Sequence, residues 1–242
     1  MGLSVNDWTL VVRNNNKGRR LKTFTGTSKC KAIVNSSKHF DNEFDLPLRI
    51  AKIRNDFPEN FKQFVISRLE KALYGNNLSV IRIFGIGSIS NSYDSRWQLA
   101  LLLYIKEHFS VDFVTSQDPI TSDLENRYLQ SCGIKVLKPD DLKSTPPSTP
   151  FNSFTLLYMI HCDYYMYENV LSCYFNKTNN YFQKIILIGN EPEGYKLNSK
   201  FQIPHLIRFA ALSSVVNFPY FSPSKTAFNE TAIYIKLDEE MI

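Results

Sequence analysis

The sequence predicts an α/β protein, a Rossmann-like three-layer sandwich around a mostly parallel, doubly wound sheet. Short strands rich in β-branched residues alternate with apolar or amphipathic helices from about residue 80 onward, which is the pattern of repeated βαβ units. The stretch 78–109 opens this pattern, because a strand-like run meets Gly85-Ile86-Gly87-Ser88 and an apolar helix follows. Strand, glycine turn and helix form the first half of a nucleotide-type βαβ unit.

Composition limits the class of protein. The 242 residues, 43% hydrophobic and 14% aromatic, can fill the core of one large α/β domain. The apolar runs are shorter than the ~20 residues that cross a bilayer, and the first residues lack the order of a secretory signal. The four cysteines form no CxxC pair and the four histidines are scattered, so we expect no metal site and reduced thiols. We therefore expect the protein in the cytoplasm, with the nucleus as the second candidate location.

The positive charge lies near the N-terminus. Residues 1–40 carry eight basic side chains against Asp7 alone, whereas the whole chain has a net charge of +5. We therefore expect a basic arm over residues 1–45 and one Rossmann-like domain over 46–242. The run that contains Arg19, Arg20 and Lys22 is compatible with nuclear targeting or contact with nucleic acid. A solvated, flexible tail is the favoured alternative, because short basic runs are common and no aromatic stacking pattern accompanies this one.

Two helices precede the first strand. Apolar residues recur at three- and four-residue steps from 46 to 73, and Pro58 divides them into two segments. The first strand is expected at 80–84, and the next helix at Ser95, where Ser95 and Gln98 have capping-box spacing. This helix is apolar nearly all round, so it should be covered on more than one side.

The same alternation continues to the end of the chain. A capping box at Ser122 and Glu125 predicts a helix between two strands, and the Pro-rich segment 138–150 predicts a surface loop. The remaining expected elements are strands at 111–115, 134–137, 154–160, 184–188 and 231–237, a helix that follows Asp163 as its N-cap, and a helix at 204–214.

Right-handed crossovers between buried strands give a sheet of order about 3-2-1-4-5 plus a C-terminal strand. Ligands of such sheets bind at the carboxyl ends of the strands, around the switch point between strands one and four. The candidate ligand-binding residues are those that follow the strands: Gly85, Gly87, Ser88, Ser90, Asp118, His161, Cys162, Gly189 and Asn190.

The glycine turn resembles a dinucleotide motif imperfectly. It is a GxGxxG pattern with Ser90 in the last place, and Asp118 at the end of the second strand could hold a ribose. However, the loop to Ser95 is long, and Asp118 comes later than the ~20 residues that the motif prefers. These departures argue against a standard NAD site. Alternatively, the glycines only let a helix pack on the strand, and Asp118-Pro119 forms a turn.

His161-Cys162 has two interpretations. The pair could be a general base beside a nucleophile, and a helix start could lower the thiol pKa of Cys162. Adjacent residues at a strand end point to opposite sides, however, and no partner acid is identifiable. A structural pair beneath the crevice is the alternative, so no catalytic residue is assigned.

Several segments together resemble the sensitivity-to-red-light-reduced (SRR-like) domain family. The segments are FGIGSISNSYDSRWQLALLL, QDPITSDLENRYLQSCGIKVL, MIHCDYYMYENVL, ILIGN, AFNETAIYI and the opening DWTLVVRNNNKGRR. The family's motif residues correspond to Gly85, Gly87, Ser88, Arg96, Gln98, Leu99, Asp118, Pro119, His161, Cys162, Tyr167, Asn169, Gly189, Asn190, Ala227, Phe228 and Asn229. The asparagine-rich composition suggests a fungal member.

The resemblance implies a regulatory protein without an agreed enzymatic activity. Family members are linked to light signalling and the circadian clock in plants, to control of haem synthesis in animals and to microtubule-related processes in fungi. We expect a crevice for a small nucleotide-type ligand of unknown identity, together with protein partners. Two alternatives remain: an adenosyl-cofactor-dependent, transferase-like enzyme, and a polyanion binder that uses the basic arm.

Overall fold

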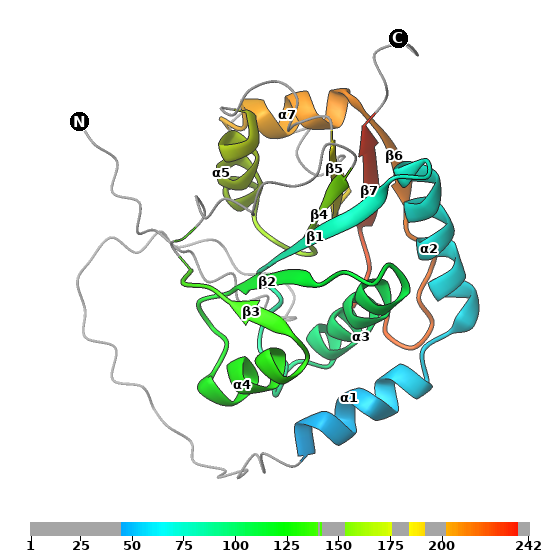
Figure 1. Ribbon diagram of the computed structural model, residues 1–242, viewed down its shortest axis with the longest axis vertical. Helices are drawn as coiled ribbons and strands as arrows, with labels where there is room; N and C mark the ends of the chain where they lie inside the picture. The colour runs from blue at the N-terminus through cyan, green and yellow to red at the C-terminus, as the bar shows by residue number, and fades with distance from the viewer. Residues whose placement is uncertain (1–44, 140, 142–152, 176–183, 192–201, 237–242) are drawn as a thin grey trace, which may run out of the picture. The chain divides into compact units, whose positions relative to one another are not determined.

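The computed structural model describes residues 45–139, 141, 153–175, 184–191 and 202–236 (Figure 1). The expected arm with Arg19, Arg20 and Lys22, apart from its last residue, lies outside these ranges. Most of the Pro-rich segment 138–150 does so as well.

One seven-stranded sheet organises the described residues, in the order β3-β2-β1-β4-β5-β7-β6. The predicted order 3-2-1-4-5 is therefore confirmed, and so is the three-layer α/β class. β1 to β5 are parallel, whereas β7 runs antiparallel to both β5 and β6. The strands are β1 Asn77–Phe84, β2 Phe113–Gln117, β3 Ile134–Val136, β4 Ser153–Met159, β5 Ile185–Asn190, β6 Ser213–Asn217 and β7 Thr231–Lys236.

β6 is a strand that the sequence analysis missed. A helix was expected to continue to residue 214, but α7 is Pro204–Ala211 and β6 begins at Ser213. Every residue of β6 is exposed or half-buried, because the strand lies at the edge of the sheet. An edge strand of this kind lacks the buried apolar run or the clean alternation by which strands are recognised.

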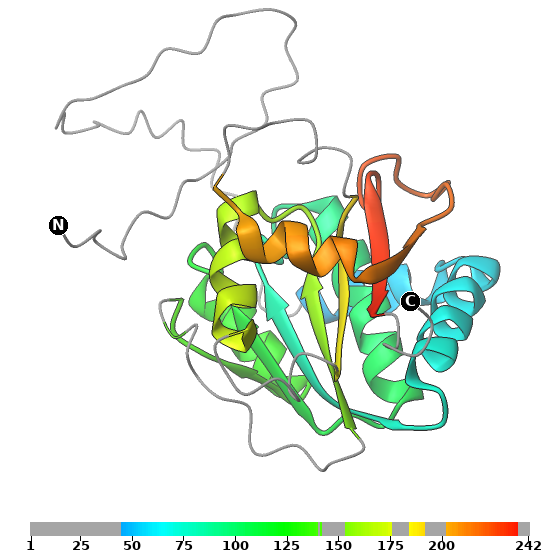
Figure 2. The same cartoon turned by 90° about the horizontal axis from the view of Figure 1, so that it is seen from above.

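Helices cover both faces of the sheet (Figure 2). One face carries α1 Asp45–Asn55, α2 Glu59–Leu73, α3 Tyr93–His108 and α4 Asp123–Ser131, whose apolar residues join one core cluster. The other face carries α5 Tyr164–Phe175 and α7, which form a second cluster with Phe84 and Leu157.

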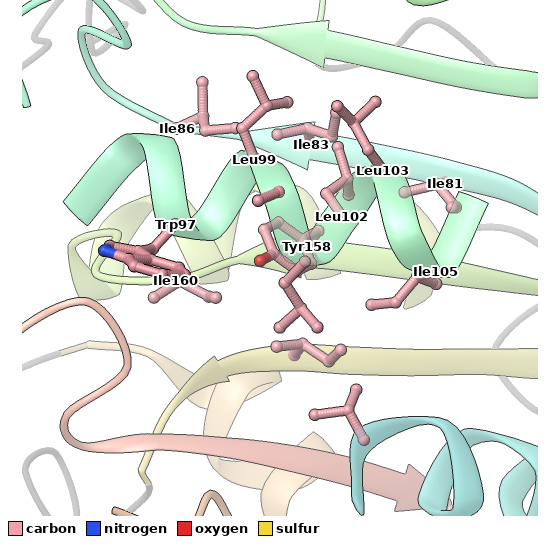
Figure 3. Close-up of a cluster of buried hydrophobic side chains, with 14 of the residues drawn as sticks. Ile81, Ile83, Ile86, Trp97, Leu99, Leu102, Leu103, Ile105, Tyr158 and Ile160 are labelled. Carbon is pink, nitrogen blue, oxygen red and sulfur yellow. The ribbon is translucent and has the colours of Figure 1, made fainter. Parts of the chain in front are cut away.

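α3 is the central helix of the first core. Figure 3 shows its side chains meeting Ile81 and Ile83 of β1, with Leu99 and Leu103 among them, and all four are buried. α1 and α2 contact its outer side, so the expectation that this helix is covered on more than one side is confirmed. Full burial of each such side chain contributes about 1.5–3 kcal/mol.

The helix caps explain where the helices begin. The Ser92 hydroxyl caps α3 by accepting a hydrogen bond from the Ser95 N–H at 3.1 Å, so the predicted start at Ser95 is wrong and the loop after the glycine turn is shorter than expected. The capping box of Ser122 and Glu125 is present in α4. Asp163 caps α5, since its Oδ1 accepts from Met166 N–H at 2.9 Å.

Candidate functional site

The glycine turn at the end of β1 requires both of its glycines. Gly85 and Gly87 have φ of 63° and 80°, in the left-handed region that side chains disfavour. A Cβ at Gly85 would lie 2.9 Å from Cys162 Sγ, and one at Gly87 would lie 2.7 Å from Ser95 Oγ. The turn is therefore packed against α3 on one side and the end of β4 on the other.

Asp118, directly after β2, holds this turn from the neighbouring strand. Its carboxylate accepts hydrogen bonds from the Gly87 N–H at 2.7 Å and the Ile120 N–H at 2.9 Å. Burial raises the pKa of Asp118 despite these two donors. The side chain that was predicted to hold a ribose thus binds the glycine turn in this structure.

Glu125 adds a second carboxylate to the turn. Besides closing the capping box, it accepts from the Ser88 hydroxyl at 2.8 Å and from the Ser90 N–H at 2.7 Å. Burial acts to raise the pKa of Glu125, but the hydrogen bonds from Ser90, Ser122 and Ser88 outweigh it and the pKa is lowered. The sequence analysis saw Glu125 only as a helix cap; its contact with the turn depends on how α4 folds back to β1.

Phosphate binding by this turn is therefore disfavoured. Three donors that a phosphate would use, Gly87 N–H, Ser88 Oγ–H and Ser90 N–H, already donate to Asp118 or Glu125. A phosphate would have to displace two carboxylates or lie against like charge. The neutral nucleoside part of a ligand meets neither obstacle.

His161 lies at the end of β4 in a left-handed conformation, with φ of 58°. Its backbone N–H donates to Asn190 Oδ1 at 2.8 Å. The ring Nε2 lies 3.1 Å from the Asn229 carbonyl oxygen, and Nδ1 lies 3.4 Å from Gln98 Nε2. Because a carbonyl only accepts, Nε2 carries the proton and Nδ1 accepts, which places a neutral ring between α3 and the segment before β7.

Cys162 is a protonated thiol. Its Sγ donates to the Phe84 carbonyl at 3.2 Å. Burial and the nearby carboxylates of Asp118 and Asp163 raise the pKa of the Cys162 thiol well above its usual value. The hypothesis that the start of α5 lowers this pKa is therefore wrong, and the alternative of a structural pair fits better, because desolvation and like charge outweigh the effect of the helix.

Asn190, the last residue of β5, bridges the neighbouring strand ends. Its Nδ2 donates to the Cys162 carbonyl at 2.8 Å, while its backbone N–H donates to the Tyr167 hydroxyl at 2.8 Å. Tyr167 in turn donates to the Met159 carbonyl. A Cβ at Gly189 would lie 2.6 Å from the Tyr167 hydroxyl, so this glycine makes room for the tyrosine.

Gln98 completes the arrangement from α3. Its Nε2 donates to the Ala227 carbonyl at 2.9 Å, and its backbone carbonyl accepts from the Tyr158 hydroxyl at 2.8 Å. We call the mutually bonded side chains at these strand ends the strand-end network. It consists of Gln98, His161, Cys162, Tyr167, Asn190 and the backbone of Asn229.

The predicted site residues thus form two groups. Gly85, Gly87, Ser88, Ser90 and Asp118 lie in the glycine turn and its acidic surroundings. His161, Cys162, Gly189 and Asn190 lie in the strand-end network. The contact of Gly85 with Cys162 joins the two groups.

The described side chains at these strand ends do not form a metal site. Among the residues that the structure describes, no group of three or more His, Cys, Asp or Glu side chains could hold a metal ion. A cavity of about 400 Å³ lies between α1, α2 and α3, with Arg54, Lys62, Tyr104 and Glu107 in its lining. Arg54 pairs with Glu107 and Lys62 lies over the Tyr104 ring, so these cations already have partners within the protein.

Comparisons with known proteins agree with the fold and the motifs. The family model described as SRR1 domain matches residues 65–235, which contain both groups of site residues. The chain is also similar to the protein SENSITIVITY TO RED LIGHT REDUCED 1 of Arabidopsis thaliana, with 29% identity over 143 residues. That match covers 58% of this chain and only 50% of the relative.

The described part of the chain contains no helix long and apolar enough to cross a membrane.

The family match extends from α2 to the last strand, so it includes the glycine turn, the acidic residues around it and the strand-end network. The chain belongs to the SRR1 domain family.

Proposed function

We propose that this chain is a regulatory protein that acts by binding, with a nucleoside-type ligand held at the carboxyl ends of β1, β2 and β4. The observation that carries the proposal is the mutual hydrogen bonding within the strand-end network. The His161 ring is hydrogen-bonded to the Gln98 side chain and to the Asn229 carbonyl, and the Cys162 thiol donates a hydrogen bond to the Phe84 carbonyl. A nucleophile activated by an adjacent base needs a different arrangement, in which the base accepts the proton of the nucleophile.

Replacement of the thiol tests whether the protein acts by binding. In Cys162→Ser the hydroxyl still donates to the Phe84 carbonyl, but the nucleophilic sulfur is gone. We expect a chromosomal Cys162→Ser allele to retain the cellular function of the wild-type gene, with Cys162→Ala as the variant that lacks the donor. A folded Cys162→Ser protein that behaves like a deletion would show that the thiol reacts, and would overturn the proposal.

The nature of the ligand follows from the acidic surroundings of the turn. Asp118 keeps acceptor capacity for ribose hydroxyls, whereas its charge and that of Glu125 oppose a phosphate. Calorimetry should therefore detect adenosine, adenosylhomocysteine or adenosylmethionine in preference to ADP or NAD, and Asp118→Asn should weaken that binding. Preference for the phosphorylated compounds would contradict this assignment.

An adenosyl-cofactor-dependent transferase is the second candidate, and the sheet topology favours it. The parallel order β3-β2-β1-β4-β5 places the GxG turn after β1 beside Asp118 after β2, as in nucleotide-binding α/β sheets. This is an analogy of fold, and folds host unrelated functions. Asp118 would hold the ribose there, and the bound cofactor would supply a transferable methyl group. Methyl transfer by the purified chain to any acceptor would favour this candidate over binding alone.

Family membership suggests the processes in which to look for partners. Light signalling and the circadian clock, haem-synthesis control and microtubule-related processes are the first in which loss of the gene should be tested. Nucleic-acid binding through Arg19, Arg20 and Lys22 is a separate proposal that depends on charge alone. Deletion of residues 1–40 should abolish that binding together with its salt dependence, and unchanged affinity would exclude it.

A further inference from the structure

A row of polar side chains lies on the face of the sheet opposite to the one that α3 covers. The parallel register pairs Arg82 of β1 with Thr115 of β2, and Thr115 with Lys135 of β3. Residues paired in register point to the same face of a sheet, and neighbouring strands lie about 4.8 Å apart. Arg82, Thr115 and Lys135 therefore form one line on the face that α5 borders; we call it the cationic row.

Arg82 is a buried cation with neutral partners. Its side chain is only 3% exposed. The guanidinium donates to Gln117 Oε1 at 2.7 Å and, at a longer 3.4 Å, to the Tyr174 hydroxyl, and it lies 4.9 Å from the centre of the Phe84 ring. Within the described residues it pairs with no carboxylate. Buried charges are normally paired, because removing an ion from water without compensation is costly.

Thr115 supplies an independent sign of a ligand. Its side chain is 2% exposed, and its Oγ1 has no hydrogen-bond partner in the part of the chain that the structure describes. A buried hydroxyl without a partner is uncommon and requires an explanation. In the register of the sheet, Thr115 lies between Arg82 and Lys135.

Lys135 places a second positive charge at the other end of the row. It is exposed, and it makes no ion pair among the described residues.

From this juxtaposition we infer that the cationic row is a binding site for the anionic group of a small molecule, a phosphate or a carboxylate. Arg82 binds two oxygens of the anion, as guanidinium groups do. The Thr115 hydroxyl donates a hydrogen bond to the anion, and Lys135 adds a positive charge from the solvent side. Gln117 positions Arg82, since its Oε1 accepts from the guanidinium while its Nε2 donates to the Lys138 carbonyl at 3.1 Å. This site lies on a different face from α3 and does not depend on the proposed function.

The test measures thermal stability and binding of the full chain with inorganic phosphate, sulfate and malonate, with sodium chloride at equal ionic strength as reference. We expect phosphate or malonate to raise the melting temperature of the wild type above the chloride reference. A response to phosphate and sulfate alone would identify a phosphate-type ligand, and a response to malonate alone a carboxylate.

Three variants locate the response. Lys135→Met leaves the core intact and should weaken the measured affinity about tenfold. Thr115→Val has the same shape without the hydroxyl, so it should fold normally and bind more weakly. Arg82→Met should abolish the response while remaining at least as stable as the wild type in chloride, because it removes a buried unpaired charge.

Lys71→Met is the matched control, because Lys71 is an exposed lysine on α2. Its response should equal that of the wild type. If the wild type shows no anion-specific shift, or if Lys135→Met and Thr115→Val both respond like the wild type, the inference is wrong. Strong destabilisation by Arg82→Met in chloride together with no shift in the wild type would assign Arg82 a purely structural role.

Discussion

The strand-end network should stabilise the fold measurably, and Asn190→Ala is its most direct test. The substitution removes the acceptor of the His161 N–H and the donor to the Cys162 carbonyl, both at 2.8 Å. Each hydrogen bond contributes about 1 kcal/mol net, so the free energy of unfolding should fall by about 2 kcal/mol. For a chain of this size that corresponds to a melting temperature lower by about 4–8 °C.

Urea denaturation followed by circular dichroism measures this loss. Asn169→Ala is the control, because Asn169 is also a motif residue of the family but its side chain is exposed on α5. It should change the stability by no more than about 0.5 kcal/mol. Asn190→Asp should fall between wild type and Asn190→Ala, since it keeps the acceptor for His161 but sets a carboxylate oxygen against the Cys162 carbonyl. If Asn190→Ala is as stable as the control, the network does not stabilise the fold.

Three further results are expected. Gly85→Ala should destabilise the protein by about 1–3 kcal/mol, because φ is positive and the new Cβ meets Cys162 Sγ. Adding Cys162→Ala to the same chain should restore only part of the lost stability. Full restoration in urea denaturation would show that the positive φ is not strained. Glu125→Gln should lower the free energy of unfolding by about 2 kcal/mol at neutral pH. Since the folded pKa of Glu125 is lowered from 4.5, the stabilisation by its carboxylate is present above that value and is lost as the pH falls through the folded pKa. The variant should therefore lose less stability on acidification than the wild type, and parallel acid titrations would refute this. Iodoacetamide at pH 8 should alkylate Cys162 more slowly than Cys173 in the folded protein, as mass spectrometry measures, because burial raises the thiol pKa; equal rates would contradict the assignment.

Local signals in the sequence were sufficient for most of the described elements. The division at Pro58, the capping box of Ser122 and Glu125, and the cap at Asp163 all follow from chemistry within a few residues, and the structure has each of them. The start of α3 was misplaced because Ser92 and Ser95 are both acceptable caps, and only the hydrogen bond shows which one is used. β6 was missed because an edge strand with no buried residue resembles a loop.

The candidate site could be located from the sequence but not interpreted. The order of parallel strands places Gly85, Asp118, His161 and Asn190 at one edge of the sheet, as predicted. Which of these groups bind one another depends on contacts between residues far apart in the chain. The hydrogen bonds from the Gly87 N–H to Asp118, from the His161 N–H to Asn190 and from Asn190 to the Cys162 carbonyl are of this kind.

The sequence by itself therefore determined the class of fold, the order of its first five strands, the family and the edge of the sheet where the motifs meet. The fold class, the strand order and the place of the motifs depend on periodicity, capping and turn chemistry, which act over a few residues, and the family follows from the resemblance of its motif segments. The tertiary structure alone decided that carboxylates occupy the donors of the glycine turn, that Cys162 stays protonated, and that Arg82, Thr115 and Lys135 form one row. Desolvation and long-range hydrogen bonds arise only when distant segments pack together, so they leave no local pattern in the sequence.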